Sequence, residues 1–373
     1  MVGSAVVVSG CGVIDLGRPR QAERPGGEPS AAPSAGPSEQ SRDEEPLEPK
    51  NDPLAGDGPL FAHFKRVRAA DPCDLVPHTM LKKYGPEQLT VRGSGMTECQ
   101  YLTGHSDASK SVYSFKIDLH AHFEQKDAED AEEEKLGGRT IYREEYSTDS
   151  ASHRSCHYKV PYEGVEGSAL ALDLLKTPPR GEESRPWPQR CTAAKHYLRA
   201  VVDRIMKLPP RKGRAVGVMG KDPCARKDDL LAALGRSYEL VDVRYSSPYG
   251  CELELANKQK NQKLTLRSGF AFHERQTGGV SSPEVKSRRL TMNGRYMLST
   301  RSDHRVTKSC QNSVELRRAT NSRKDDAHYV TVGLSSAKLK VEDEDASFEA
   351  PPVSCTLATK LTRIVLGGVR SSS

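Results

Sequence analysis

The sequence lacks long apolar runs and has few aromatic residues. Phe, Trp and Tyr make up 6% of the 373 residues, so any hydrophobic core must be lean. No stretch of about 20 apolar residues is present, and we therefore expect no membrane-spanning helix. The nine cysteines form no Cys-x-x-Cys or Cys-x-His pair, the close spacing from which structural zinc sites usually take their ligands.

Familiar catalytic motifs are also missing. The sequence contains no Gly-x-Ser-x-Gly, no glycine-rich phosphate loop and no His-Glu-x-x-His. These motifs place a nucleophilic serine, a nucleotide phosphate and a catalytic zinc ion, respectively. We therefore predict a protein that is not an enzyme and that uses neither a cofactor nor a metal ion.

The charge is unevenly distributed along the chain. The formal net charge is +6, but residues 12–57 hold ten acidic and five basic residues, a net of −5 that leaves +11 elsewhere. Such an excess of Lys and Arg is typical of a solvated surface. It could also favour anionic surfaces such as wall polymers or lipid headgroups; we do not expect nucleic-acid binding.

Eight of the nine cysteines fall into two sets of four with matching neighbours. The gaps are 26, 57 and 35 residues in the first set and 27, 59 and 45 in the second. In both sets the first cysteine follows Asp-Pro, the third stands in Ser-Cys-x-x-x-Val, and the fourth begins Cys-Thr. The chain therefore holds two tandem copies of a unit of about 140–150 residues. The sets are Cys73, Cys99, Cys156 and Cys191, then Cys224, Cys251, Cys310 and Cys355.

Each unit is expected to begin with a short helix and to end with a longer one. Asp71 and Asp222 suit the N-cap of the short helix, with Pro72 and Pro223 at the first helical position and Gly85 and Gly235 after the last. The longer helix of the first unit has an apolar face at three-four spacing. That face comprises Ala194, Tyr197, Leu198, Val201, Val202 and Ile205.

Between the helices the sequence alternates between polar and apolar residues. In 111–119 the odd positions from Tyr113 to Leu119 are apolar, which predicts a half-buried antiparallel strand. Residues 263–272, 294–301 and 328–335 predict further strands. The expected fold class is α+β: two tandem repeats, each an antiparallel sheet with a short N-terminal and a longer C-terminal helix.

An even number of cysteines per unit favours disulfides in an oxidising compartment. Confinement within the repeats leaves nine pairings, of which we favour sequence neighbours. These are Cys73–Cys99, Cys156–Cys191, Cys224–Cys251 and Cys310–Cys355. The alternatives are a four-cysteine zinc site in each unit and a catalytic thiol.

A few other residues form candidate sites. His120, His122 and Glu124 alternate on one predicted strand and could bind a metal ion, although a solvated strand edge explains them as well. The acidic run 126–135 is interpreted as a solvated hairpin tip or mobile loop. Trp187 is expected in a rigid connector, and the basic segment 207–214 in a linker that could alternatively meet an anionic partner.

The N-terminal region predicts a lipid anchor. Residues 12–60 are rich in Pro, Gly, Ser, Ala and Glu and predict a disordered tether. Val8-Ser9-Gly10-Cys11 resembles a bacterial lipobox, in which Cys11 receives the lipid. Because a signal peptide has a basic start and 7–15 apolar residues, we expect 1–11 to be the remnant of a signal whose start codon lies upstream.

With these features, residues 65–373 resemble actinobacterial envelope lipoproteins built on a cysteine-paired domain of unknown function, in two tandem copies. The motifs of the resemblance are Asp-Pro-Cys at the start of each unit and a later Cys-x-x-Ala helix. The resemblance implies no catalytic residues and no ligand. The expected domains are 1–11, 12–60, repeat 1 at 61–208, a linker at 209–221 and repeat 2 at 222–373.

We therefore expect a monomeric lipoprotein on the extracytoplasmic face of the cell membrane, anchored through Cys11. It would act as a non-catalytic module that binds or senses a small or polymeric envelope ligand. One alternative is an envelope hydrolase with a site between the repeats, although no polar cluster recurs at one spot in both units. Another is a cytosolic, metal-binding protein.

Overall fold

A computed structural model describes most of the chain beyond residue 57. The described residues are 58–92, 95–104, 110–144, 155–177, 190–212, 218–274, 284–304, 307–318, 326–338 and 351–370. All of them belong to one compact unit, Glu48–Ser373. Cys11, Trp187 and the predicted signal remnant lie outside the described residues, as does the tether up to residue 57.

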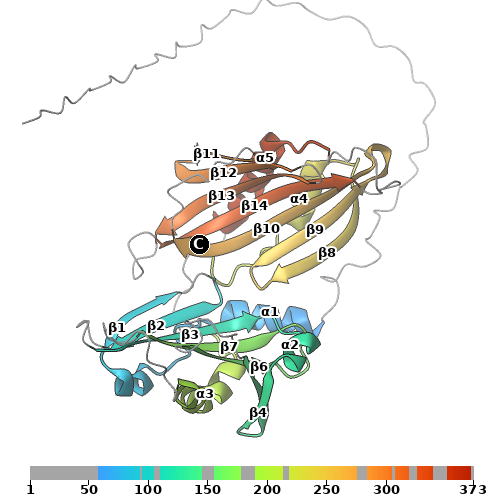
Figure 1. Cartoon of the computed structure of the whole chain (residues 1–373). Helices are drawn as coiled ribbons and strands as arrows, with labels where there is room; N and C mark the ends of the chain where they lie inside the picture. Colours follow the sequence, from blue (N-terminus) through green and yellow to red (C-terminus); the bar gives the residue numbers. More distant parts are fainter. Residues whose placement is uncertain are drawn as a thin grey trace, which may run out of the picture. The chain divides into compact units, whose positions relative to one another are not determined.

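The first half contains seven strands, three α-helices and one 3₁₀-helix among the described residues (Figure 1). They are α1 (Pro59–Ala69), η1 (His78–Tyr84), β1 (Glu87–Arg92), β2 (Glu98–Gly104), β3 (Val112–Ala121), α2 (Gln125–Glu129), β4 (Glu132–Leu136), β5 (Arg139–Glu144), β6 (Ser155–Pro161), β7 (Ala169–Thr177) and α3 (Arg190–Met206).

The described part of the second half again has seven strands, with two α-helices and one 3₁₀-helix. They are α4 (Lys227–Leu234), β8 (Glu239–Ser247), β9 (Gly250–Asn257), η3 (Lys258–Lys260), β10 (Gln262–Glu274), β11 (Val285–Met292), β12 (Arg295–Asp303), β13 (Lys308–Arg318), β14 (Asp326–Lys338) and α5 (Cys355–Arg370).

The two halves have the same strand order. The first sheet is ordered β1-β2-β3-β7-β6-β5-β4, and the second β8-β9-β10-β14-β13-β12-β11. Every paired neighbour is antiparallel. Each strand of the second sheet therefore has a counterpart seven strands earlier in the chain.

The described residues are thus mostly β-structure, arranged as two antiparallel sheets with few helices. The α+β expectation holds in this outline, but the predicted helix arrangement is not confirmed. Two helices of the first half, α1 and α2, were not predicted and have no counterpart in the described second half. None of the described helices is long and apolar enough to cross a membrane.

The predicted helix starts at Asp71 and Asp222 are wrong. Both carboxylates instead accept a hydrogen bond from the backbone N–H two residues on, at 3.0 Å from Cys73 and 2.9 Å from Cys224. The short α-helix of the second half starts only at Lys227, and η1 starts at His78. A local side-chain turn forms here in place of the first helical turn, because an aspartate can bond a nearby backbone N–H in non-helical conformations.

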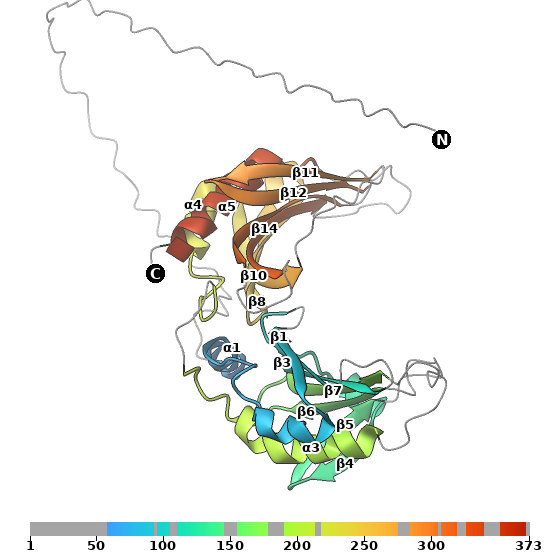
Figure 2. The ribbon, with the colours of Figure 1, turned by 90° about the vertical axis from the view of Figure 1, so that its left-hand side faces the viewer.

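One face of each sheet is covered by helices, and the other is open (Figure 2). Along β3, Phe115, Ile117 and Leu119 are fully buried, as the alternation predicted, and the Phe115 ring lies 4.8 Å from that of Tyr197 on α3. In the second half, α5 supplies the matching cover. Its buried residues in this core are Ala358, Leu361, Val365 and Leu366.

Candidate functional site on the open sheet faces

Four disulfides hold the helices and turns to the sheets at matching places. The pairs are Cys73–Cys99, Cys156–Cys191, Cys224–Cys251 and Cys310–Cys355, with Cα atoms 5.2, 5.2, 5.2 and 5.4 Å apart. These are the pairs expected from sequence neighbours. The eight cysteines of the two sets are therefore engaged in disulfides, so the alternative of a four-cysteine zinc site in each unit is wrong.

The disulfides also define equivalent positions on the two open faces. Cys156 on β6 and Cys310 on β13 face the helices, so the next residue of each strand, His157 or Gln311, faces the open side. Following the cross-strand partners from this residue gives one row of side chains across each sheet.

In the first sheet the row is charged and continuous. Four residues on neighbouring strands lie opposite one another in turn across the sheet. In order, they are Lys116 on β3, Asp173 on β7, His157 on β6 and Glu144 on β5. The Asp173 carboxylate contacts Nδ1 of His157, and a Glu144 carboxylate oxygen lies 3.4 Å from Nε2. Lys159 Nζ lies 2.5 Å from the other Glu144 oxygen. This network satisfies the row from within the chain.

The imidazole of His157 is 10% exposed between these carboxylates. Burial lowers its pKa, Glu144 opposes that change, and the nearby Lys159 and Lys116 reinforce it. The ring is held by a hydrogen bond with Asp173 on one side and by the nearby Glu144 carboxylate on the other. It therefore acts as the centre of a cross-strand network.

In the second sheet the same row has a gap. Arg267 on β10 occupies the place of Lys116, Gly333 on β14 that of Asp173, and Gln311 on β13 that of His157. On the far side of Arg267 lies Glu252 of β9. The row therefore holds a cation and an amide with no side chain between them.

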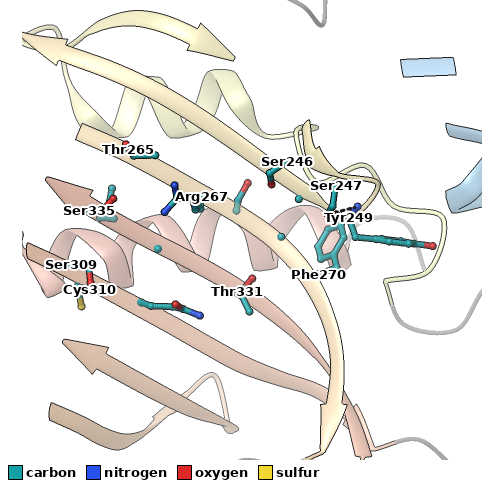
Figure 3. Close-up of a pocket in the computed structure, with 16 residues that line it drawn as sticks. Ser246, Ser247, Tyr249, Thr265, Arg267, Phe270, Ser309, Cys310, Thr331 and Ser335 are labelled. Atoms are coloured by element: carbon teal, nitrogen blue, oxygen red, sulfur yellow. Dashed lines mark hydrogen bonds between the residues drawn. The ribbon is translucent and has the colours of Figure 1, made fainter. Parts of the chain in front are cut away.

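A hollow of about 350 Å³ lies over this gap (Figure 3). Figure 3 shows Arg267 and Thr265 on β10 beside Thr331 and Ser335 on β14. The wider lining is rich in hydroxyl groups. It also includes Ser246, Ser247, Ser309 and Gln311.

The backbone does not require glycine at position 333. A Cβ atom there would lie 3.9 Å from the nearest atoms of Gln311, an ordinary contact, and no positive φ is involved. At Gly269, by contrast, a Cβ would lie 2.9 Å from the Tyr249 carbonyl oxygen. Glycine inside a strand weakens it and often marks a place where another group approaches closely. Gly333 therefore leaves space that the fold itself does not need.

Arg267 is oriented by a buried carboxylate. Its Nε donates to Glu252, whose side chain is 4% exposed, and Arg244 donates to the other carboxylate oxygen. Although burial raises the pKa of Glu252, the hydrogen bonds from Arg267 and Arg244 hold it below its ordinary value. Arg267 itself is 61% exposed, and its Nη atoms have no further hydrogen bond among the described residues.

The predicted metal pair His120 and His122 does not form. A bulge between Asp118 and Ala121 disturbs the pairing of β3 with β7, and the two imidazoles have different partners. His120 Nδ1 lies 2.7 Å from the Ser168 hydroxyl, whereas His122 lies 3.0 Å from Glu124 on the surface. Within the described ranges, no three His, Cys, Asp or Glu side chains are placed to hold a metal ion.

The Ser168 hydroxyl also forms a hydrogen bond with a second histidine, His63, which was not identified from the sequence. His63 of α1 is 2% exposed, and its Nε2 lies 2.9 Å from the Ser168 hydroxyl. Burial lowers the pKa of both His63 and His120 to about 4, helped by the charge of a neighbouring histidine in each case. Both rings are therefore neutral at physiological pH.

The two charged segments have structural contacts of their own. The acidic run 126–135 is neither a hairpin tip nor a loop throughout, since it forms most of α2 and β4; Arg143 of β5 contacts both Glu132 and Glu134 of β4. In the basic segment, Arg211 donates to the carbonyl oxygens of Ala69 and Ala70 at the end of α1, at 3.2 and 3.0 Å.

Comparison with known proteins gives no family for this chain. No protein-family model and no curated protein matches the sequence. The chain is similar to a solved structure described as "The crystal structure of Tle4-Tli4 complex", with 10% identity and a TM-score of 0.28, covering 76% of this chain and 98% of that one. It is also similar to immunity protein TplEi of T6SS from Pseudomonas aeruginosa, with 8% identity and a TM-score of 0.25, covering 74% and 95%. Likenesses of this size carry no functional argument, and the resemblance to actinobacterial lipoproteins stays a prediction.

Sequence reasoning missed the row that contains Arg267, Gln311 and Gly333. A usable indication was nevertheless present, because His157 and Gln311 directly follow the third cysteine of each set. Their partners lie on strands tens of residues away, so only the sheet register identifies them. The predicted domain boundaries remain untested.

Proposed function

We propose that this protein is a lipid-anchored module of the cell envelope, built as two tandem copies of one domain, which binds a partner rather than catalysing a reaction. The observation that supports export is the set of four disulfides at matching places in both halves. Disulfides of this kind persist in oxidising compartments and are rare in reducing ones. The anchor would be a lipid on Cys11, and the ligand would meet the open face of the second sheet.

Binding is favoured by the contrast between the two open faces. The first sheet fills its central row with its own charged side chains, whereas the second leaves a hollow beside Arg267. A folded chain that leaves a cation beside an unfilled space has a site at which an external group can complete the row. This is the feature on which we base a binding role.

The export proposal is tested by thiol titration and by lipid labelling in a bacterial host. The unreduced, denatured protein should contain no reactive thiol apart from Cys11, whose thiol would be blocked once lipidated. The full-length chain supplied with an export signal should incorporate labelled palmitate, and Cys11→Ser should not. Several reactive thiols per chain, or equal labelling of Cys11→Ser, would contradict the proposal.

A further inference from the structure

We infer that the hollow beside Arg267 binds a carboxylate side chain of a protein partner, presented on an extended acidic segment. This inference rests on the binding role proposed above and specifies its ligand class. The first sheet provides the template, because there the corresponding space contains the carboxylate of Asp173.

The two groups that flank the hollow are suited to a carboxylate. Arg267 occupies the position in the second sheet that Lys116 has in the first. It offers guanidinium N–H donors, which form bidentate hydrogen bonds with carboxylates. Gln311 replaces His157, the residue that contacts Asp173 in the first sheet, and offers amide N–H donors. Among the described residues, neither the Gln311 amide nor the Arg267 Nη atoms have a hydrogen bond, so these donors can serve a ligand.

The charge of the adjoining hairpin agrees with an acidic partner. The β11–β12 hairpin, 285–303, carries five basic residues and one acidic residue, whereas its counterpart β4–β5, 132–144, carries three basic and four acidic residues. Arg289 of this hairpin lies in the neighbouring row of side chains on the same sheet face as Arg267. That row runs across the sheet in the order Gly269, Thr331, Ser313, Leu298 and Arg289. Of the five basic residues, Arg289 is the one that alternates onto the open face, because Arg301 lies opposite the helix-facing Cys310 and Lys286, Arg288 and Arg295 alternate with it. Its charge, together with that of Arg267, steers acidic segments toward the hollow.

The shape of the site favours a protein over a small molecule. Pockets for small ligands usually bury most of the ligand surface. Here the lining residues are spread over the β8–β9 turn, β10, β13 and β14, on an open sheet face, and Arg267 remains 61% exposed. A carboxylate that reaches the gap left by Gly333 would be held most effectively when the rest of an extended chain covers the surrounding hydroxyl groups.

The test uses the full oxidised chain and a labelled hexapeptide of alternating Ser and Asp, with the Ser-Asn hexapeptide as the matched neutral probe. The aspartate peptide should bind, and the asparagine peptide should bind at least about tenfold more weakly, the loss expected when a hydrogen-bonded charge is removed. Free succinate should compete only weakly. Succinate binding as tightly as the peptide would overturn the protein-partner inference.

Two variants and one control distinguish binding of the peptide in the hollow from a general effect of the protein's charge. Gly333→Asp should fill the gap with its own carboxylate and weaken binding at least about tenfold, and Arg267→Gln should do the same by removing the guanidinium. Asn293→Asp adds the same charge in the β11–β12 turn, where Asp is well tolerated, and should change binding less than about threefold.

The outcome is decisive whether or not Gly333→Asp is stably folded, because Arg267 is 61% exposed and Glu252 keeps its hydrogen bond from Arg244 in Arg267→Gln. Unchanged binding in Arg267→Gln, equal binding of the two peptides, or no binding of the aspartate peptide up to about 1 mM would overturn the inference. The assay uses purified protein, so failure of the lipid-anchor proposal leaves its result unaffected, and failure here leaves export and anchoring untouched.

Discussion

The two sheets share their strand order and disulfide positions but differ in the middle of the open face. In the first sheet Asp173 contacts His157, which also lies beside Glu144, so the row is complete. In the second sheet Gly333 takes the place of Asp173 and leaves a hollow beside Arg267. The same scaffold therefore supports one face satisfied by its own side chains and one face with unused donors.

The scaffold and the site are therefore set by separate residues. The buried rows and the disulfides fix the register of both sheets, and they are alike in the two halves. The open face is under no such packing constraint, because a strand places alternate residues on opposite sides. A single change from Asp to Gly can therefore replace a row filled by its own side chains with a row that contains a gap, without disturbing the core.

The largest expected effect comes from removing the shared covalent framework. Replacing both cysteines of Cys73–Cys99 by Ala should lower the free energy of unfolding by about 3.5 kcal/mol, and replacing those of Cys310–Cys355 by about 4 kcal/mol. The second loop is the longer one, with 45 residues against 26. Urea unfolding of each variant without reductant measures the loss. If either loss were below about 1 kcal/mol, the framework would not support the two halves equally.

A pH effect should arise from two histidines of the first half. His63 and His120 have pKa values of about 4 in the folded protein and ordinary values near 6.5 when unfolded. Because the unfolded chain takes up these protons first, the free energy of unfolding should fall between pH 6.5 and about pH 4. The slope is about 1.4 kcal/mol per pH unit for each histidine. The second half has Ala271 at the position corresponding to His120, four residues beyond Arg267.

Urea unfolding at pH 7 and at pH 5 measures this pH effect. His63→Gln and His120→Asn keep an amide near the nitrogen that contacts Ser168, and each should reduce the loss of stability at pH 5. His196→Gln is the control, since His196 is exposed on α3. An undiminished loss in both His63→Gln and His120→Asn would show that other groups cause it.

The smallest expected effect comes from removing the Asp173 side chain from the row of the first sheet. Asp173→Gly should reproduce the gap of the second sheet and lower the free energy of unfolding by about 2 kcal/mol, because buried His157 loses the carboxylate at Nδ1. Gly333→Ala, the matched change in the second sheet, should be neutral or stabilising by about 0.5 kcal/mol. Thermal and urea unfolding compare the two. Equal effects would mean that the two rows do not differ in the way described above.

Much of the framework could be predicted from the sequence. The four disulfides join the sequence neighbours that were favoured among nine possible pairings. The alternation in 111–119 predicted the buried face of β3, because the two faces of a strand alternate every residue. The helix starts at Asp71 and Asp222 were predicted wrongly, because an aspartate two residues before a backbone N–H can form a turn as well as a helix cap. Helix α1 was missed, although Phe61, Phe64 and Val67 recur at helical spacing, because the disordered tether was predicted to reach residue 60, and α1 begins at Pro59.

Hydrophobic alternation along the chain was enough to indicate which residues of β3 face the core, whereas the cysteine spacing only favoured one pairing among nine. That Arg267, Gly333 and Gln311 form one row, and that Ser168 lies between His63 and His120, is known from the tertiary structure alone. These residues come from segments far apart in the sequence. Their meeting depends on strand order and register, which local periodicity does not specify.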